Sequence, residues 1–556
     1  MSSLEKYFFK RPRALQYVHA GREYRHGDAH ETGNDHALLP SNTDASGETR
    51  SKSDAKSIAH PDSTTILHRT HLDLFIDLIF VGIVGNIAEH TSERLFVAPE
   101  GHEGTSADAF KAILEFTLEF LLTWRIWNYL RNFTNMFFQD DLTQRMFIIW
   151  ILILALIFGN NVSYTFVNYK GASFTFSIYL IIRGSFFYIE GIYCLFIRWM
   201  WKEWLLSTIT SLPATGLWIG AIFATGWAQL GLVMGALFID YTGAIFRNSP
   251  LLDRLLSKDY RKTPDLDHYV ERISSFYVII LGEGVLNLIK GSPLGEGLTA
   301  EVGSGIATLA MYFILHMLYF KSQASGEGFR AVRMSHFQGA LWQLAHVLIF
   351  GALLLLDVSN LFLVTHQDAS ALDPPESEPT SPEKRRRLAL FTRASTEEPT
   401  EEELPHYVRV GLYTSSGALA IVLFGITVIT LLHSSQFYKA MKNKTLLDHP
   451  FIRAIPRVIL IIIFPCLPLM GVQVGRNWLA IAVGSLSALT MLELFMAYRR
   501  CGSGVVEPAP KGDGKHNTGT RLKTLSTVSP QSRADAPESP VDTPESLRDL
   551  RHRFTA

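Results

Sequence analysis

Long apolar blocks alternate with polar segments along most of the chain. An α-helix needs about 20 apolar residues to cross the hydrocarbon core of a bilayer, and the blocks have roughly this length. The pattern therefore predicts an all-α, polytopic transmembrane helical bundle with about 12 spans, and no fewer than 10. The twelve blocks lie at residues 71–89, 110–130, 145–167, 174–198, 204–223, 227–246, 269–289, 302–321, 337–364, 407–432, 453–473 and 477–498.

Basic side chains are concentrated in every second connection between the blocks. The connection after the sixth block, for example, contains Lys258, Arg261 and Lys262, whereas the connection after the fifth block contains no Lys or Arg. Because Lys and Arg gather in cytoplasmic loops, this alternation favours an even number of spans with both termini in the cytoplasm. The basic cluster Lys384 to Arg387 opposes this topology, so the side of the loop 366–405 stays open.

Three segments are too polar to form a packed core, and we expect them to be disordered. They are a cytoplasmic N-terminal tail at 1–65, the loop 366–405 and a cytoplasmic C-terminal tail at 501–556. The transmembrane helical domain then occupies 66–500. The C-terminal tail contains three Ser/Thr-Pro steps that proline-directed kinases would recognise, although an unmodified tail fits equally well: Ser529-Pro530, Ser539-Pro540 and Thr543-Pro544.

Composition and motifs exclude several classes of function. The chain is 47% hydrophobic and 19% charged with a net charge of −1, which gives no sign of a nucleic-acid partner. Its three cysteines have neither disulfide nor metal-ligand spacing. No phosphate-binding loop, serine elbow or zinc-protease motif is present. We therefore expect no enzyme and no cofactor; the lipid bilayer is the expected partner, and a homo-oligomer is compatible with the sequence.

The first and seventh blocks align without a gap at an offset of 197 residues, which places His71 on His268. The third and ninth blocks align at an offset of 192 residues, where the string Leu-Ile-Phe-Gly ends at Gly159 and recurs ending at Gly351. Short apolar strings also match by chance. The shared order and similar offsets favour a parallel duplication of a six-helix unit, with halves at 66–263 and 264–500.

Asp73 and Asp77 lie one helical turn apart in the first block, so they share a face. Two neighbouring carboxylates repel each other unless one binds a proton, a cation lies nearby, or a basic side chain such as Arg272 compensates them. One interpretation is a site for a cation or a proton. The other is a static buried ion pair that fixes helix packing.

The seventh block contains Glu271 and Arg272 near its start and Glu283 deeper in the span, between Gly282 and Gly284. Charged groups inside a bilayer are costly, and they usually face protein or water and serve a function. Glu271 and Arg272 fit either a gating pair or a pair that reaches the membrane surface. The flanking glycines permit close helix approach or local unwinding at Glu283. Glu283 shares a helix face with Ser275 and Ile279, and it is the stronger candidate.

His346 in the ninth block completes the set of candidate ion-binding residues. It fits either a metal or haem pair with His336, ten residues earlier, or a buried histidine satisfied by hydrogen bonds. The candidate residues are Asp73, Asp77, Glu271, Arg272, Glu283 and His346. Further polar residues in the blocks indicate a polar interior: Glu115, Glu119, Arg125, Arg183, Glu190, Asp240, His316 and Asp357.

Two stretches contain extended motifs, His71-Leu-Asp-Leu-Phe-Ile-Asp-Leu-Ile-Phe-Val and His268-Tyr-Val-Glu-Arg-Ile-Ser-Ser-Phe-Tyr-Val-Ile-Ile-Leu-Gly-Glu-Gly-Val. They resemble the two signatures of the low temperature requirement protein A family, Glu-Leu-Phe-Phe-Asp-Leu-Val-Phe-Val and His-x-x-Glu-Arg followed by Leu-Gly-Glu-Ser. Asp77 matches the motif aspartate, Asp73 replaces the usual Glu, and Gly284 replaces Ser. The resemblance implies an integral membrane protein without a defined substrate, and the long tails suggest a eukaryotic, fungal member.

Two functions follow as expectations. The first is a transporter or channel-like protein in which acids of the first and seventh blocks, chiefly Asp77 and Glu283, bind a cation or couple protons. The alternative is a non-transporting scaffold or sensor of stress or lipid state that signals through its cytoplasmic tail. The membrane would be the plasma membrane or an endomembrane.

Overall fold

The computed structural model describes most of the apolar part of the chain and two short pieces near its start. The described residues are 16–19, 22–25, 63–96, 105–137, 141–247, 260–262, 266–323, 336–366, 406–440, 449–469 and 475–502. The predicted loop at 366–405, apart from His366, and nearly all of the C-terminal tail lie outside them.

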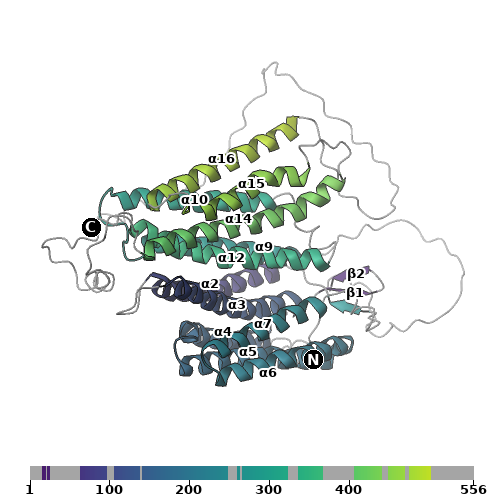
Figure 1. Ribbon diagram of the computed structural model, residues 1–556. Helices are drawn as coiled ribbons and strands as arrows, with labels where there is room; N and C mark the ends of the chain where they lie inside the picture. The colour runs from purple at the N-terminus through teal and green to yellow at the C-terminus, as the bar shows by residue number, and fades with distance from the viewer. Residues whose placement is uncertain are drawn as a thin grey trace, which may run out of the picture. The chain divides into compact units, whose positions relative to one another are not determined.

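Twelve α-helices occur in the described residues, and each matches one predicted block (Figure 1). Ten of them are long and apolar enough to cross a membrane, which confirms the polytopic helical bundle. Helix α3 falls short because of its charged residues, and α15 because it has only 17 residues. The helices are α2 (Ser63–Phe96), α3 (Ser106–Phe137), α4 (Leu142–Asn161), α5 (Tyr169–Phe196), α6 (Trp201–Phe223), α7 (Gly226–Arg247), α9 (Leu266–Ile289), α10 (Ala300–Gln323), α12 (His336–Thr365), α14 (His406–Ala440), α15 (Pro450–Cys466) and α16 (Gly475–Gly502).

Short elements accompany the helices. The 3₁₀ turns η1 (Val162–Tyr164) and η2 (Arg198–Met200) follow α4 and α5. The strands β1 (Gln16–His19), β2 (Arg22–Arg25) and β3 (Tyr260–Lys262) form an antiparallel sheet in the order β2-β1-β3. Strands of three or four residues are too short for alternation to reveal them in the sequence. The rest of the predicted N-terminal tail lies outside the described residues up to the start of α2.

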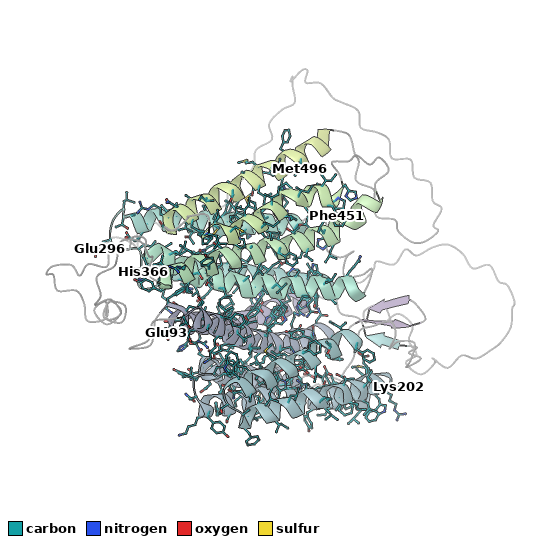
Figure 2. The ribbon with its side chains drawn as sticks, in the orientation of Figure 1. Glu93, Lys202, Glu296, His366, Phe451 and Met496 are labelled. Atoms are coloured by element: carbon teal, nitrogen blue, oxygen red, sulfur yellow. The ribbon has the colours of Figure 1, made fainter. Side chains whose placement is uncertain are left out.

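The helices run back and forth between two ends of the bundle. Glu93, Glu296 and His366 lie at one end, and Lys202 and Phe451 lie at the other (Figure 2). Side-chain caps fix some of the turns: Asp141 accepts a hydrogen bond from the Gln144 N–H at the start of α4, over 2.8 Å. This alternation agrees with the distribution of basic residues in the sequence.

The helices of each half pack in the same pattern, which supports the predicted duplication. The packed pairs α2–α3, α2–α4, α3–α5, α3–α7, α4–α5, α5–α6 and α6–α7 have as counterparts α9–α10, α9–α12, α10–α14, α10–α16, α12–α14, α14–α15 and α15–α16. Arg125 of α3 and Lys321 of α10, which are 196 residues apart, both lie beside an acid on the last helix of their half. The structural correspondence therefore extends to single side chains.

The two halves meet along α2, which packs against α9, α12 and α14. Helix α12 is the most buried of the ten apolar helices, with 83% of its most apolar stretch inside the protein. Large apolar side chains such as Leu74, Phe75 and Leu78 of α2 are exposed and suit contact with lipid. Polar residues of α2, α9 and α12 that face the join are therefore shielded from lipid.

Candidate functional site

A buried ion-pair cluster joins the start of α2 to the start of α9. One guanidinium nitrogen of Arg272 lies 2.9 Å from Oδ1 of Asp77, and the other lies 3.4 Å from Oδ1 of Asp73. Nε2 of His268 lies 2.6 Å from Oδ2 of Asp73, and the Trp127 indole N–H donates to Oδ1 of Asp77 over 2.8 Å. The structure therefore compensates both aspartates with basic side chains of the other half.

Arg131 of α3 extends this cluster. Its guanidinium lies 4.0 Å from the ring centre of Tyr269 and 4.7 Å from that of Trp127, and it donates to the Tyr269 hydroxyl over 2.9 Å. Asn135 contacts Nδ1 of His268 over 3.1 Å. Arg272 pairs with both aspartates, and Arg131 is a second basic side chain near Asp77. The geometry favours the static ion pair as the interpretation of Asp73 and Asp77.

Glu271 and Arg272 do not act as a pair. Arg272 is 3% exposed and points into the cluster, whereas Glu271 lies on the exposed side of α9. Successive residues of a helix point in different directions, so one neighbour turns inward and the other outward. The structure supports a role in helix packing for Arg272 and places Glu271 outside the cluster.

Glu283 meets a carboxylate that lies far away in the sequence, Asp357 of α12. The two carboxyl groups are close enough to interact electrostatically. Asp357 is 2% exposed and makes no ion pair with any residue that the structure describes. Neither of its oxygens makes a hydrogen bond of good geometry with a described residue, although the hydroxyl of Tyr312 lies nearby. Among the described residues, Asp357 therefore lacks the basic partner that Asp77, Asp240 and Glu493 have.

Two glycines bring the acid pair close to neighbouring backbones. A Cβ on Gly284 would lie 2.6 Å from Oδ1 of Asp357 and 2.7 Å from its Cγ. A Cβ on Gly85 of α2 would lie 2.6 Å from Oε1 of Glu283. Only glycine leaves room for the two carboxyl groups at these positions, which explains Gly284 in the Gly-Glu-Gly step of α9 and Gly85 in α2.

Replacing Gly284 with alanine is expected to displace Asp357 and to lower stability by about 1–3 kcal/mol, because the added methyl group overlaps a packed carboxyl group. Gly282→Ala is the matched control, since a Cβ there meets no atom within 4 Å and alanine favours a helix. Thermal unfolding of the purified variants in detergent measures the difference. Equal unfolding temperatures for the two variants would contradict the close approach.

Glu283 lies nearer to solvent than Asp357. Its side chain is half-buried, and it interacts electrostatically with Lys290 at the end of α9 and with Glu89 of α2. Lys290 and Glu89 are exposed and form an ion pair over 3.4 Å. The acid pair is therefore connected to the end of the bundle at which α2 and α9 finish.

His346 is fully buried and lies in neither acid cluster. Its Nδ1 lies 2.7 Å from the backbone carbonyl oxygen of Trp342, and its Nε2 lies 3.1 Å from the Tyr319 hydroxyl oxygen. In the residues that the structure describes, no group of three or more His, Cys, Asp or Glu side chains suits a metal ion. The geometry agrees with a histidine held by hydrogen bonds, and the side chain of His336 is not among those described.

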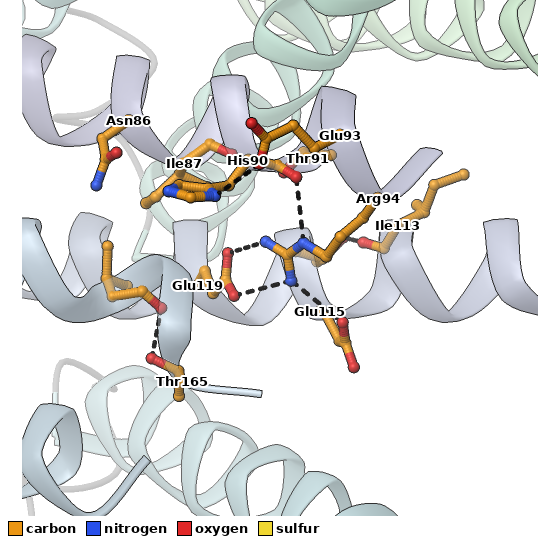
Figure 3. Close-up of polar contacts among 12 residues, drawn as sticks. Asn86, Ile87, His90, Thr91, Glu93, Arg94, Ile113, Glu115, Glu119 and Thr165 are labelled. Atoms are coloured by element: carbon orange, nitrogen blue, oxygen red, sulfur yellow. Dashed lines mark hydrogen bonds and ion pairs between the residues drawn. The ribbon is translucent and has the colours of Figure 1, made fainter. Parts of the chain in front are cut away.

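The remaining buried charges form three compensated groups. Near the end of α2, Arg94 bridges Glu115 and Glu119 of α3, with nitrogen–oxygen distances of 3.1 Å and 2.8 Å (Figure 3). In the first half, the carboxylate of Asp240 on α7 accepts from Arg183 on α5 over 2.8 Å. In the second half, Glu493 on α16 lies 2.6 Å from Arg457 and 3.4 Å from Lys321.

The sequence did not indicate that Asp357 partners Glu283. In the sequence, Asp357 is one of several polar residues in the apolar blocks. The distance along the chain between a residue of α9 and a residue of α12 does not show whether the two are in contact. The combination of Gly284 with a carboxylate on another helix becomes visible only when the helices are packed.

Comparison with known proteins agrees with the two motifs. The family model for bacterial low temperature requirement A protein (LtrA) matches residues 68–492. No curated protein and no solved structure matches the chain. The matched region spans most of the chain and contains the ion-pair cluster, the acid pair and His346. The chain is a multipass membrane protein that belongs to the LtrA family.

Proposed function

We propose that the protein moves protons or small cations across its membrane and that Glu283 and Asp357 bind the transported species. One observation carries this proposal: Asp357 is buried beside a second acid without a basic partner among the described residues. A buried carboxylate without a counter-charge is costly, so it takes up a proton or holds a cation. Such a carboxylate can bind and release a cation or proton more readily than a carboxylate that is held in a permanent ion pair.

The compensated acids provide the contrast. Asp77, Asp240 and Glu493 each lie within 3 Å of an arginine nitrogen, which neutralises them in place. Replacing such a partner by an ion from solution would require breaking a buried pair. These groups hold helices together in the proposal, and the acid pair binds the ion.

The proposal includes an orientation. With both termini in the cytoplasm, the Asp77–Arg272 cluster lies toward the cytoplasmic side, and Glu283 lies toward the opposite side. Helix α2 contacts both groups, because it carries Asp77 near its start and Gly85 beside Glu283. A movement of α2 against α9 would therefore affect the ion-pair cluster and the acid pair together.

Flux measurements in proteoliposomes test the proposal. A potassium diffusion potential set by valinomycin drives protons across the membrane, and a pH-sensitive dye in the lumen reports them; sodium and potassium fluxes are measured in parallel. We expect Asp357→Asn and Glu283→Gln to reduce flux about 10²-fold, because each removes an ionisable group from the path. Glu93→Gln, an exposed acid on α2, is the control and should leave flux unchanged.

Two results would contradict the proposal. One is unchanged flux in Asp357→Asn, with the variant shown to be folded by its unfolding temperature. The other is the absence of proton, sodium and potassium flux in the wild-type protein, which would favour the scaffold or sensor.

A further inference from the structure

We infer that the transported species is a proton and that it crosses the protein along a line of buried side chains in the second half. The line runs from Glu283 and Asp357 through Tyr277 and Tyr319 to His346, with His433 beyond. This inference rests on the proposed function and adds its substrate and its route. It would make His346 part of the path and not only a packing residue.

The first part of the line lies between α9 and α12. The carboxyl group of Asp357 interacts electrostatically with the hydroxyl of Tyr277, which is fully buried and has no hydrogen-bond partner in the structure. Glu283 of α9 and Tyr312 of α10 also lie near Asp357, and the buried side chain of Asn360 on α12 lies near Tyr312. A buried hydroxyl without a partner is uncommon, because burial without a hydrogen bond is unfavourable. Here it lies next to a carboxyl group that can bind a proton.

The second part lies between α9, α10 and α12. The rings of Tyr277 and Tyr319 are stacked, with 3.7 Å between their centres, and the Tyr319 hydroxyl lies 3.1 Å from Nε2 of His346. The carbonyl oxygen of Trp342 can only accept, so Nδ1 of His346 carries the hydrogen. Nε2 is then the acceptor for the Tyr319 hydroxyl and is the ring nitrogen that faces the line.

His433 of α14 repeats this arrangement. Its Nδ1 lies 2.9 Å from the backbone carbonyl oxygen of Ser322, so Nδ1 again carries the hydrogen. Its Nε2 is buried and has no hydrogen-bond partner among the residues that the structure describes. His346 interacts electrostatically with both His433 and Arg131 of α3. His433 lies beside the last turn of α10, so the line extends toward the end of the bundle opposite Glu283.

A proton that moves along this line leaves each tyrosine with its hydroxyl hydrogen at the end of the step. A proton leaves the Asp357 carboxyl group, an oxygen lone pair of a tyrosine accepts it, and that tyrosine releases its own hydroxyl proton to the next group. Nε2 of His346 accepts the proton, which gives an imidazolium, while Asp357 becomes a carboxylate. Glu283 then returns a proton to Asp357 and takes up another from the solution at its own end of the bundle, while the imidazolium of His346 releases its proton toward His433 and becomes neutral again. A sodium or potassium ion needs several oxygen ligands at each step, whereas each step here offers a single hydroxyl or ring nitrogen, which suffices only for a proton.

The duplicated first half provides an internal comparison. At the offsets that align the two halves, the counterparts of Glu283, Tyr277, Tyr319, His346 and Asp357 are, in that order, Asn86, Phe80, Thr123, Leu154 and Thr165. None of these five side chains is ionisable near neutral pH. Figure 3 shows Asn86 and Thr165, which donate to the backbone carbonyl oxygens of Gly159 and Val162. The ionisable line thus belongs to the second half alone.

Tyrosine-to-phenylalanine substitutions test the route, because they remove the hydroxyl and keep the ring. We expect Tyr319→Phe to reduce proton flux in proteoliposomes about 10²-fold, and His346→Gln to do the same. The matched control is Tyr179→Phe in α5, which is equally buried with an unpartnered hydroxyl but lies in the first half. It should transport like the wild-type protein. Wild-type proton flux should also be slower in heavy water and should persist when sodium is left out of the assay.

The outcomes distinguish failure of the proposed function from failure of the inferred substrate and route. If Asp357→Asn abolishes proton flux while Tyr319→Phe and His346→Gln transport normally, the acid pair stands and the route is wrong. If wild-type vesicles carry sodium or potassium but no protons, the inferred substrate is wrong and the proposed function survives. Unfolding temperatures of all variants show that any loss of flux is not a loss of folded protein.

Discussion

Replacing Arg272 with methionine is expected to lower the free energy of unfolding by about 3–5 kcal/mol, which is typical for breaking a buried ion pair from one side. Arg272 is the shared partner of Asp73 and Asp77, and all three side chains are at most 5% exposed. Methionine retains much of the volume of arginine but removes the charge. The two carboxylates would then keep only His268, Trp127 and the more distant Arg131 as polar neighbours.

A second substitution separates loss of charge from loss of packing. Adding Asp77→Asn to Arg272→Met removes one of the stranded carboxylates, so the double variant should recover part of the stability that the single variant loses. Thermal unfolding in detergent and the monodisperse yield measure both. Lys170→Met, at an exposed position, is the control and should stay within about 0.5 kcal/mol of the wild type. A double variant less stable than Arg272→Met would contradict the assignment.

Replacing Asp240 with asparagine is expected to have an effect of similar size, about 3–5 kcal/mol, because it leaves two buried guanidinium groups without a carboxylate. Arg183 and Arg125 both face Asp240, and none of the three side chains is more than 6% exposed. The indole of Trp218 also donates to this carboxylate, over 3.3 Å. The variant should lose its compact fold at a lower temperature and at a lower denaturant concentration.

The corresponding acid of the second half provides the comparison. Glu493→Gln strands Arg457 and Lys321, but 29% of the Lys321 side chain is exposed and can be hydrated. We therefore expect Glu493→Gln to destabilise the protein less than Asp240→Asn. The reverse order, measured by thermal unfolding under identical conditions, would show that burial does not control the strength of these groups.

The sequence predicted the helices well because hydrophobic length is a strong signal in membrane proteins. Each apolar block became one helix, and the six-helix repeat is supported by the same packing pattern in both halves. The signal failed for strands β1 to β3, which are too short to show a period.

The site was predicted in part. Close approach at Gly284 and compensation of the aspartates by Arg272 were each one of the alternatives that the sequence left open. The acid partner of Glu283 could not be foreseen, because Asp357 reaches it only through the packing of α9 against α12. The prediction also treated Glu271 and Arg272 as a unit, although the helix turns them to opposite sides.

The position of Arg272 has a consequence for assembly during synthesis. Asp73 and Asp77 are made with the first half, whereas Arg272 and His268 follow only after α7. Until then, Asp73 and Asp77 lack Arg272 and His268 and lie at the surface against which α9 later packs. Cellular quality control can recognise such unpaired acids. We expect a fragment ending at residue 263 to be degraded when it is produced alone and to be rescued by co-expression of residues 264–556. The same fragment with both Asp73 and Asp77 replaced by asparagine should not be degraded when it is produced alone.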